Sequence, residues 1–316
     1  MSHGHDHQHG HGGHSHAVSA DANRRQLAIA LGLILGLMVL EVAVGLVADS
    51  LALISDAAHM LTDAVAIGLS LWAASLATRP AKGSLTYGYR RAEILAAQFN
   101  GATLLTLAVL IVIEAGRRLA SPPSVEATLM LAVAAAGVAV NLLATWVLAK
   151  ANRASLNVEG SFQHIVTDLY AFLGTGIAAI VILATGFERA DPIASLFVAA
   201  LMLRAAYGLL KASGRIFLEA APEGMDVDEI GTALAGHPGV VEVHDLHVWE
   251  VTSGFPSLSA HILVESGADC HGIREQLEGV IDKRFGIHHT TLQVEHRNPR
   301  LVQMSSRRPG RRARGG

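Results

Sequence analysis

Six stretches of the chain are each apolar over the roughly 20 residues that a helix needs to cross a bilayer. They lie at Leu27–Val47, Leu51–Ala77, Ala92–Ala115, Ala127–Ala149, Leu156–Ala184 and Pro192–Leu210. The charge content agrees, because only 16% of the 316 residues are charged, against about 25% in an ordinary soluble domain. The pattern predicts an α-helical membrane protein with six transmembrane helices in a domain over residues 26–214.

Basic residues are distributed unevenly between the ends of these stretches. With the N-terminus inside, ten lie at cytoplasmic ends and loops and three lie on the opposite side. The ten are Arg24, Arg25, Arg79, Lys82, Arg90, Arg91, Lys150, Arg153, Lys211 and Arg215, and the three are Arg117, Arg118 and Arg189. Because Lys and Arg beside membrane helices favour the cytoplasmic side, we expect both termini to be cytoplasmic. A compact chain without a sorting signal favours a bacterial inner membrane.

The first 25 residues are rich in His and Gly and lack the apolar stretch of a secretory signal. Seven of the 17 His of the chain fall within the first sixteen residues. Such a segment cannot fold by burial, and its imidazoles can hold zinc, copper, nickel or iron loosely. We interpret residues 1–25 as a flexible, metal-collecting cytoplasmic tail. An expression tag or a neutral linker is the alternative.

The pattern HxxxD occurs twice within the apolar stretches. His59 precedes Asp63 by four residues in the second stretch, and His164 precedes Asp168 by four in the fifth. Residues four apart lie on the same face of an α-helix. An ionised Asp at the centre of a membrane helix costs at least ~2.5–3.5 kcal/mol, and such residues tend to be functional. The repeated pair therefore predicts a functional site inside the membrane.

If the two HxxxD faces oppose each other, two imidazole nitrogens and two carboxylate oxygens converge on one point. This donor set suits Zn²⁺ in tetrahedral geometry, or Co²⁺ or Cd²⁺, whereas an all-oxygen set suits Mg²⁺ or Mn²⁺. The alternative is that each His hydrogen-bonds its neighbouring Asp and stabilises helix packing. Metal ligands must be deprotonated, and imidazole titrates near physiological pH. A site that alternates between metal and protons predicts a metal–proton antiporter.

Other polar residues also interrupt the apolar stretches. Asp56 lies three residues before His59 and either guides ions outward or bonds a neighbouring helix. For Glu41, Asn141 and Arg204, we expect structural hydrogen bonds between helices.

After Arg215 the long apolar stretches stop and short alternating segments begin. Helical spacing at Met225–Ala235 and Cys270–Arg284, with strand-like runs at Val240–Thr252, Ser257–Glu265 and Thr290–Glu295, predicts an αββαβ domain over residues 215–298. His244 and His247, three positions apart, should point to opposite faces of a strand. Residues 299–316 are rich in Arg, and we expect a disordered basic tail that can touch anionic lipid headgroups.

Four motifs occur together in this chain. They are SLALISDAAHMLTDA in the second stretch, TYGYRRAEILAA from Thr86 to Ala97, the HxxxD of the fifth stretch, and DPIASL from Asp191 to Leu196. In combination they resemble the cation diffusion facilitator family, and within it the bacterial zinc, cadmium and cobalt efflux branch. The resemblance implies a six-helix homodimeric transporter that exports a divalent metal from the cytoplasm in exchange for protons. It places the transport site on His59, Asp63, His164 and Asp168.

The resemblance extends to about His296 and also covers the C-terminal domain. It implies a ferredoxin-like fold that serves as a dimerisation unit. It places cytoplasmic metal ligands on His244, His261, His288 and Glu295, with His271, His296 and Cys270 as alternatives. Zinc bound there is expected to promote dimer closure and thereby transport.

Other classes of protein fit the sequence less well. No HExxH motif is present and a four-ligand site is closed, so we expect no enzyme and no organic cofactor. A net charge of −3 gives no basic field for nucleic acid. A membrane-anchored metal sensor or buffer without transport is the remaining alternative. It would explain the His-rich segments but does not need ligands inside the bilayer.

Overall fold

The computed structural model describes residues 14–47, 51–122 and 126–297. The chain divides into two compact units. The first runs to Leu218 and also includes Val251–Gly254, and the second contains Glu219–Glu250 and the chain from Phe255 onward. Each unit has its own hydrophobic core, so each is described by itself.

The first unit consists of long helices. They are α1 (His14–Val47), α2 (Leu51–Ala77), α3 (Ala92–Ala120), α4 (Ala127–Leu148), α5 (Leu156–Thr185) and α6 (Ala190–Phe217). Within the described residues, five of them are long and apolar enough to cross a membrane, and α2 contributes a shorter apolar segment, Asp63–Ala77. The prediction of a helical membrane domain is confirmed.

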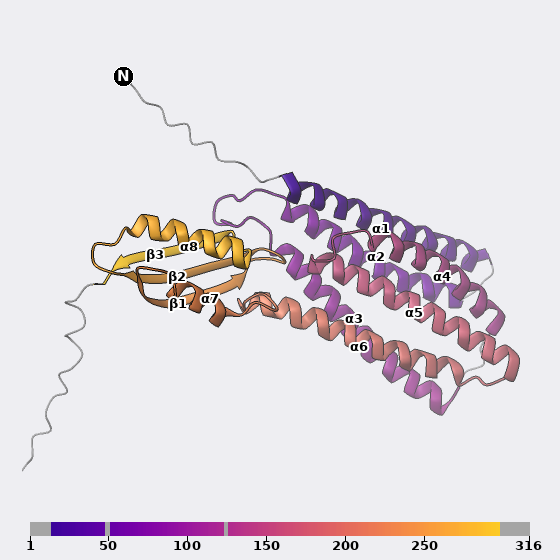
Figure 1. Cartoon of the computed structure of the whole chain (residues 1–316). Coiled ribbons are helices and arrows are strands. Elements are labelled where there is room, and N and C mark those ends of the chain that lie inside the picture. Colours follow the sequence, from indigo (N-terminus) through magenta and orange to yellow (C-terminus); the bar gives the residue numbers. More distant parts are fainter. Residues whose placement is uncertain (1–13, 48–50, 123–125, 298–316) are drawn as a thin grey trace, which may run out of the picture. The chain divides into compact units, whose positions relative to one another are not determined.

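These helices form two packed groups (Figure 1). Helices α1, α2, α4 and α5 share one core, in which Leu27, Ile34, Ile67, Leu148 and Ile165 are buried. Helices α3 and α6 pack together around a second core of Leu104, Ala108, Val198, Met202, Ala206 and Leu209. The α2–α5 contact lies inside the first group, and both HxxxD motifs are on these two helices.

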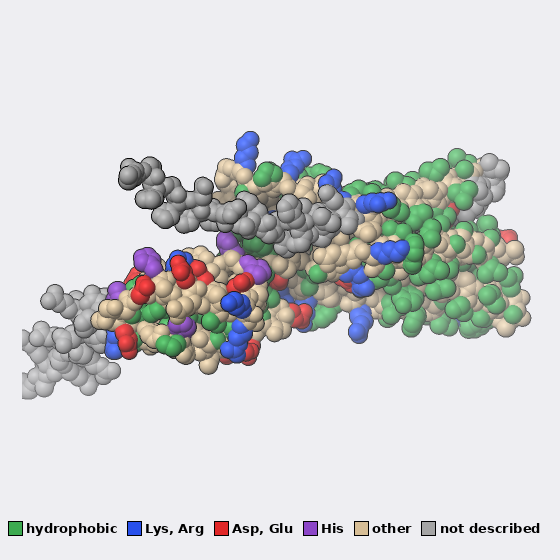
Figure 2. All heavy atoms as spheres, turned by 45° about the horizontal axis from the view of Figure 1, so that its top comes forward, with side chains coloured by type: hydrophobic (Ala, Val, Ile, Leu, Met, Phe, Trp, Pro, Cys, Tyr) green, Lys and Arg blue, Asp and Glu red, His purple; other side chains and the backbone are tan. Residues whose placement is uncertain are grey.

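The surface of the helices is apolar over most of the face seen in Figure 2, while Lys and Arg gather toward one end of the helices. Large hydrophobic side chains point outward along the spans, among them Trp72, Phe197 and Tyr207. Water would not favour so many exposed apolar side chains, whereas lipid does. The surface therefore fits a bilayer environment.

The second unit is a small α+β domain. Its elements are α7 (Val227–Ala235), β1 (Val240–Glu250), β2 (Pro256–Val264), α8 (Cys270–Phe285) and β3 (His289–His296). The predicted αββαβ order is confirmed. Strand β2 is central, antiparallel to β1 and parallel to β3. Apolar side chains of α7, α8 and one sheet face form the core, with Leu234, Leu258, Ile262, Leu277 and Ile281 among them.

Several boundaries differ from those predicted, and α6, for example, runs over Ala190–Phe217 and not over Pro192–Leu210. Helix α1 begins at His14, within the segment expected to be a flexible tail up to residue 25. Ala is frequent between residues 17 and 30 and favours helix, which lets the helix extend beyond the apolar span. Strand β1 ends at Glu250 and not at Thr252, because a turn with Gly254 at φ 72° follows it. Residues 1–13 and the Arg-rich segment 299–316 lie outside the described residues.

Candidate metal centres

The interface of α2 and α5 brings together two ionisable side chains from different helices. The Nε2 atom of His164 lies 2.8 Å from Oδ1 of Asp63. Both residues are deeply buried, with 1% of His164 and 4% of Asp63 exposed. Burying ionisable groups inside an apolar helix bundle is costly unless they are paired or hydrogen-bonded, and such residues tend to be functional.

Asp168 completes a three-residue group. Its Oδ2 atom lies 3.9 Å from the same Nε2 atom of His164. Asp63, His164 and Asp168 each offer one ligand atom, and these atoms lie within 4.8 Å of one another. The backbone of His59 is in α2, four residues before Asp63, but its side chain lies outside the described set. Three of the four predicted ligands are thus brought together.

The electrostatics of this group favour a cation. Two carboxylates close to each other in an apolar bundle repel, and each loses its hydration. The Nδ1 atom of His164 is buried and has no hydrogen-bond partner among the described residues. A divalent ion would neutralise both carboxylates and accept a ring nitrogen, with ligand bonds of about 2.0–2.2 Å for zinc. The group can therefore bind a metal of the zinc class.

A hydrogen-bonded cluster holds α2 against α5 two turns away. Ser70 follows Asp63 by seven residues, and Asn157 precedes His164 by seven, so each pair shares a helix face. Asn157 Nδ2 donates to the Ser70 carbonyl at 2.8 Å, and Asn100 Nδ2 of α3 donates to the Ser70 hydroxyl at 3.0 Å. All three residues are buried. These bonds fix the register in which Asp63 meets His164.

A small cavity of about 100 Å³ opens beside the three-residue group. Asp63, Asp168, Asn141 and Phe172 are among its lining residues. Asn141 differs from its prediction, because its Nδ2 donates to the Gly137 carbonyl of its own helix, at 3.0 Å, and not to another helix. The carbonyl one turn back on the same helix lies within reach of the amide. Asn141 thus bonds within α4 while its side chain lines the cavity.

A larger groove of about 500 Å³ lies between α5 and α6. Thr167, next to Asp168, lines it together with Gln163, Glu159 and Arg204. Arg204, expected to bond a neighbouring helix, has an exposed side chain and faces this groove. The groove extends from Tyr170 toward the N-terminal end of α5, whereas the cavity extends from Asp168 to Thr175 in the other direction. Of the two, the cavity is the one that members of the three-residue group, Asp63 and Asp168, line.

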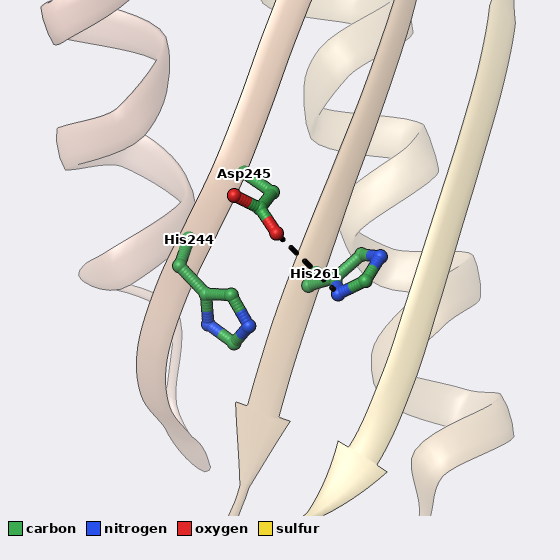
Figure 3. A group of neighbouring side chains, drawn as sticks. All are labelled: His244, Asp245 and His261. Atoms are coloured by element: carbon green, nitrogen blue, oxygen red, sulfur yellow. Dashed lines mark ion pairs between the residues drawn. The ribbon is translucent and has the colours of Figure 1, made fainter.

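The second unit carries a separate group of candidate ligands on the open face of its sheet. The rings of His244 on β1 and His261 on β2 are 5.4 Å apart, and these two residues are direct cross-strand partners. Asp245 Oδ2 lies 4.0 Å from His261 Nδ1, and one ligand atom of each residue lies within 4.8 Å of the others. Figure 3 shows the Asp245 carboxylate turned toward the His261 ring.

A β-bulge explains why two consecutive residues of β1 join this group. The register shifts between His244 and His247, and Asp245 has a φ of 51°, in the left-handed region. Regular alternation would send Asp245 to the opposite face from His244, and the bulge re-aims it. Asp tolerates this conformation better than most residues. Asp245 is not predicted from the sequence, because in a regular strand it would point to the face opposite His244.

The same bulge corrects the expected orientation of His247. His244 pairs with His261 and His247 with Ser259, and these two β2 residues are two positions apart on one face. His244 and His247 therefore share a face, and the prediction of opposite faces is wrong. The inserted residue changes the alternation by one. His247 is still not part of the group of close ligand atoms.

The remaining predicted ligands of the second unit lie elsewhere in its described residues. His288 bonds the carboxylate of Asp282 on α8, and Glu295 bonds Gln293 on β3. Neither belongs to the His244 group. Cys270 Sγ lies 3.5 Å from His296 Nε2, which also contacts the Ala268 carbonyl at 3.0 Å. The backbone N–H of His271 donates to the helix-capping side chain of Asp269.

Comparison with known proteins gives matches over both units. The family model described as the cation efflux transmembrane domain matches residues 27–218, and the one for the cation efflux protein cytoplasmic domain matches residues 222–297. The cadmium, cobalt and zinc/H(+)-K(+) antiporter of Bacillus subtilis (strain 168) is 38% identical over 268 residues, covering 83% of this chain and 86% of the relative.

Two further relatives are also named as metal transport proteins. The metal cation efflux system protein CzcD of Cupriavidus metallidurans is 39% identical over 259 residues, 82% of each chain. The zinc transporter ZitB of Escherichia coli (strain K12) is 37% identical over 267 residues, 84% of this chain and 85% of the relative. A solved metal-bound C-terminal domain of CzcD from Cupriavidus metallidurans is 32% identical, with a TM-score of 0.22, and covers 22% of this chain and 99% of that domain. This multi-pass membrane protein therefore belongs to the cation diffusion facilitator family, in its bacterial zinc, cadmium and cobalt efflux branch.

Proposed function

We propose that this protein exports a divalent metal, zinc first and cadmium or cobalt as further substrates, from the cytoplasm by exchange for protons. The proposed transport site consists of His59, Asp63, His164 and Asp168. The observation that carries the proposal is the buried contact of His164 with carboxylates of two helices. The names of its relatives, which are efflux proteins and antiporters, support the same reaction.

The geometry favours a metal site over a purely structural pair. In a structural pair, each His would bond the Asp four residues later on its own helix. Here His164 is closer to Asp63 of α2, at 2.8 Å, than to Asp168 of α5, at 3.9 Å. One ring nitrogen between two carboxylates leaves a net negative group in an apolar bundle, which a divalent cation compensates. The addition of His59 gives the two-nitrogen, two-oxygen set that zinc prefers.

Proton exchange follows from the chemistry of these ligands. The carboxylates and imidazoles bind metal only when they are deprotonated, so protons and metal compete for the same atoms. If protons occupy the ligands when the site faces outward, metal is released there, and the protons return inward with the empty carrier. Metal binds only after protons leave the ligands, and protons bind only after metal leaves, so the two fluxes are coupled.

The cavity beside the site and the groove along α5 suggest a route for alternating access. We assign the α5–α6 groove of about 500 Å³ to cytoplasmic entry and the cavity of about 100 Å³ to exit. The groove extends toward the N-terminal end of α5, which is cytoplasmic if the excess of basic residues marks the inside. Rocking of helices around a fixed midplane site is the general way in which such carriers alternate.

The proposed assembly is a homodimer in a bacterial inner membrane, with six spans per chain and both termini in the cytoplasm. Helix α2 is 27 residues long, which is enough to cross as the sixth span. The family model that matches residues 222–297 is named for dimerisation, which supports a homodimer. The αββαβ order and the β1-β2-β3 sheet are compatible with a ferredoxin-like unit.

We further propose that cytosolic zinc binds the second unit and stimulates transport. His244, His261 and the newly identified Asp245 form the nearest group of ligands within the described residues. Their side chains are between 41% and 67% exposed, so cytosolic metal can reach them directly. His288 and Glu295 stay proposed ligands, which a second chain or a rearrangement would have to bring to the group.

Zinc flux in proteoliposomes tests the transport proposal. Purified protein is reconstituted with equal potassium on both sides, and zinc uptake is followed with and without an imposed pH gradient. We expect uptake that accelerates with the gradient and is lost in Asp63→Ala and His164→Ala. Flux that ignores the gradient would refute proton coupling. Zinc binding without any flux would favour the membrane-anchored sensor or buffer.

A further inference from the structure

The turn between β1 and β2, Val251–Gly254, belongs to the first unit although both strands belong to the second. Three hydrogen bonds attach it there. Arg91 Nε donates to the Val251 carbonyl at 3.3 Å, and the Thr252 hydroxyl donates to the Arg90 carbonyl at 3.2 Å. The backbone N–H of Leu156 donates to the Ser253 hydroxyl at 3.2 Å. The turn therefore bonds the starts of both α3 and α5.

The bond from Leu156 to Ser253 satisfies an amide at the start of α5 that has no partner within the helix. The first amides of a helix have no partner within the helix, and a Ser at the preceding position usually accepts one of them. Ser155 occupies that position before α5 but makes no such bond. Its hydroxyl donates instead to the Glu93 carboxylate of α3, at 3.5 Å. Ser253, 97 residues away in sequence, accepts a hydrogen bond from the first amide of α5.

The helix that receives this cap carries two of the proposed transport ligands. His164 lies eight residues after Leu156, about 12 Å along a rigid helix axis. The hairpin that supplies the cap carries His244 and Asp245 on its first strand and His261 on its second. From His247 onward its ladder is continuous up to the turn, with Trp249 opposite Ser257 and Glu250 opposite Pro256.

We propose that Ser253 is a positioning residue through which zinc bound by the β1–β2 hairpin acts on α5 and hence on the transport site. Zinc held by His244, Asp245 and His261 would tie both strands together across the bulge and restrict their twist. Because the turn is covalently continuous with both strands, the change reaches the Ser253 hydroxyl and the first turn of α5. This inference rests on the proposed function, since it names the route of the proposed regulation.

Two variants of Ser253 separate the hydroxyl from the rest of the turn. Ser253→Ala removes the acceptor, and Ser253→Thr keeps it. Ser266→Ala is the matched control, because that hydroxyl bonds the Arg297 carbonyl within the second unit. All variants are made in the full-length protein, and a His244→Ala/His261→Ala variant defines transport without the zinc response.

Zinc uptake at increasing cytoplasmic-side zinc and hydrogen exchange of residues 156–159 are measured together. In wild type and Ser253→Thr, we expect zinc to stimulate uptake and to slow exchange of the Leu156 amide. In Ser253→Ala, uptake should fall to the level of the His244→Ala/His261→Ala variant, and this amide should exchange about fivefold faster. Ser266→Ala should behave like wild type.

Each failure has a distinct meaning. If wild type is stimulated by zinc and Ser253→Ala is stimulated equally, the positioning role is refuted while the proposed function stands. If zinc leaves the exchange of residues 156–159 unchanged in wild type, the route through α5 is refuted even where stimulation occurs. If wild type moves no zinc, the proposed function is refuted and the regulatory inference with it.

Discussion

His164 is the residue on which the proposed membrane site depends, because its Nε2 atom faces carboxylates of both α2 and α5. A nitrogen ligand favours zinc, cobalt and cadmium, whereas oxygen ligands favour manganese and magnesium. We therefore expect His164→Asp to lower the transport preference for zinc over manganese by about tenfold or more, the scale of affinity change that smaller perturbations of metal sites produce.

Competition between zinc and manganese uptake in proteoliposomes measures this change. His247→Asp is the matched control, since His247 lies on the second unit's sheet and belongs to no group of close ligands in the described chain. An unchanged zinc preference in His164→Asp would contradict selectivity through the nitrogen ligand.

Asp245 permits a test that leaves the backbone undisturbed. Asn also tolerates the left-handed conformation that Asp245 adopts at φ 51°. Asp245→Asn therefore removes the negative charge while the bulge is kept, and we expect zinc binding by the second unit to weaken by about tenfold. Calorimetric titration of the full-length protein measures it, with Glu275→Gln on α8 as control. Equal affinity in Asp245→Asn and wild type would exclude the carboxylate as a ligand.

At the residue scale, the sequence predicts those neighbouring site residues whose contact depends on helix periodicity alone. His164 and Asp168 share a face of α5 because they are four residues apart, and this spacing can be read from the sequence. The closest contact, between Asp63 and His164, depends on how α2 and α5 pack, which periodicity does not specify. Asp245 could not be predicted from alternation, because a bulge reverses it. The only available signal is an Asp, a residue that tolerates positive φ, within the strand pattern.

Helices α4 and α5 approach each other closely at Gly137. A Cβ atom at this position would lie 2.3 Å from the Phe172 ring, which lines the cavity beside Asp63 and Asp168. Gly137→Ala must therefore displace the ring or separate the helices, and we expect a loss of about 1–3 kcal/mol in stability together with slower zinc transport. Thermal unfolding in detergent and zinc flux measure the two effects.

Gly116→Ala serves as the control for that variant, because a Cβ there would meet nothing within 4 Å. Both changes replace Gly by Ala in a membrane helix and give the same gain in helix propensity. A Gly137→Ala protein as stable and as active as Gly116→Ala would contradict the close α4–α5 packing.

At the element scale, the sequence predicts the existence of the helices and strands better than their ends. Apolar length identifies the spans because the bilayer thickness fixes it. Helix α1 nevertheless extends back to His14, since a helix can continue in water on local propensity alone. The attachment of Val251–Gly254 to the first unit could not be predicted, because it depends on hydrogen bonds between residues more than 90 positions apart.

At the scale of the whole molecule, the distribution of charge determines the expected orientation. Lys and Arg gather toward one end of the helices, and the basic residues near the span ends show the same asymmetry in the sequence. The positive-inside tendency then places the second unit in the cytoplasm. The same orientation is required if cytosolic zinc is to reach His244, Asp245 and His261.

The single cysteine of the chain makes this orientation directly measurable. Cys270 begins α8 in the second unit and is partly exposed. We expect a membrane-impermeant maleimide to label it in inside-out vesicles and not in intact cells. In a Cys270→Ser background, Ser121→Cys at the exposed end of α3 should show the opposite pattern. Labelling of Cys270 from outside intact cells would invert the topology.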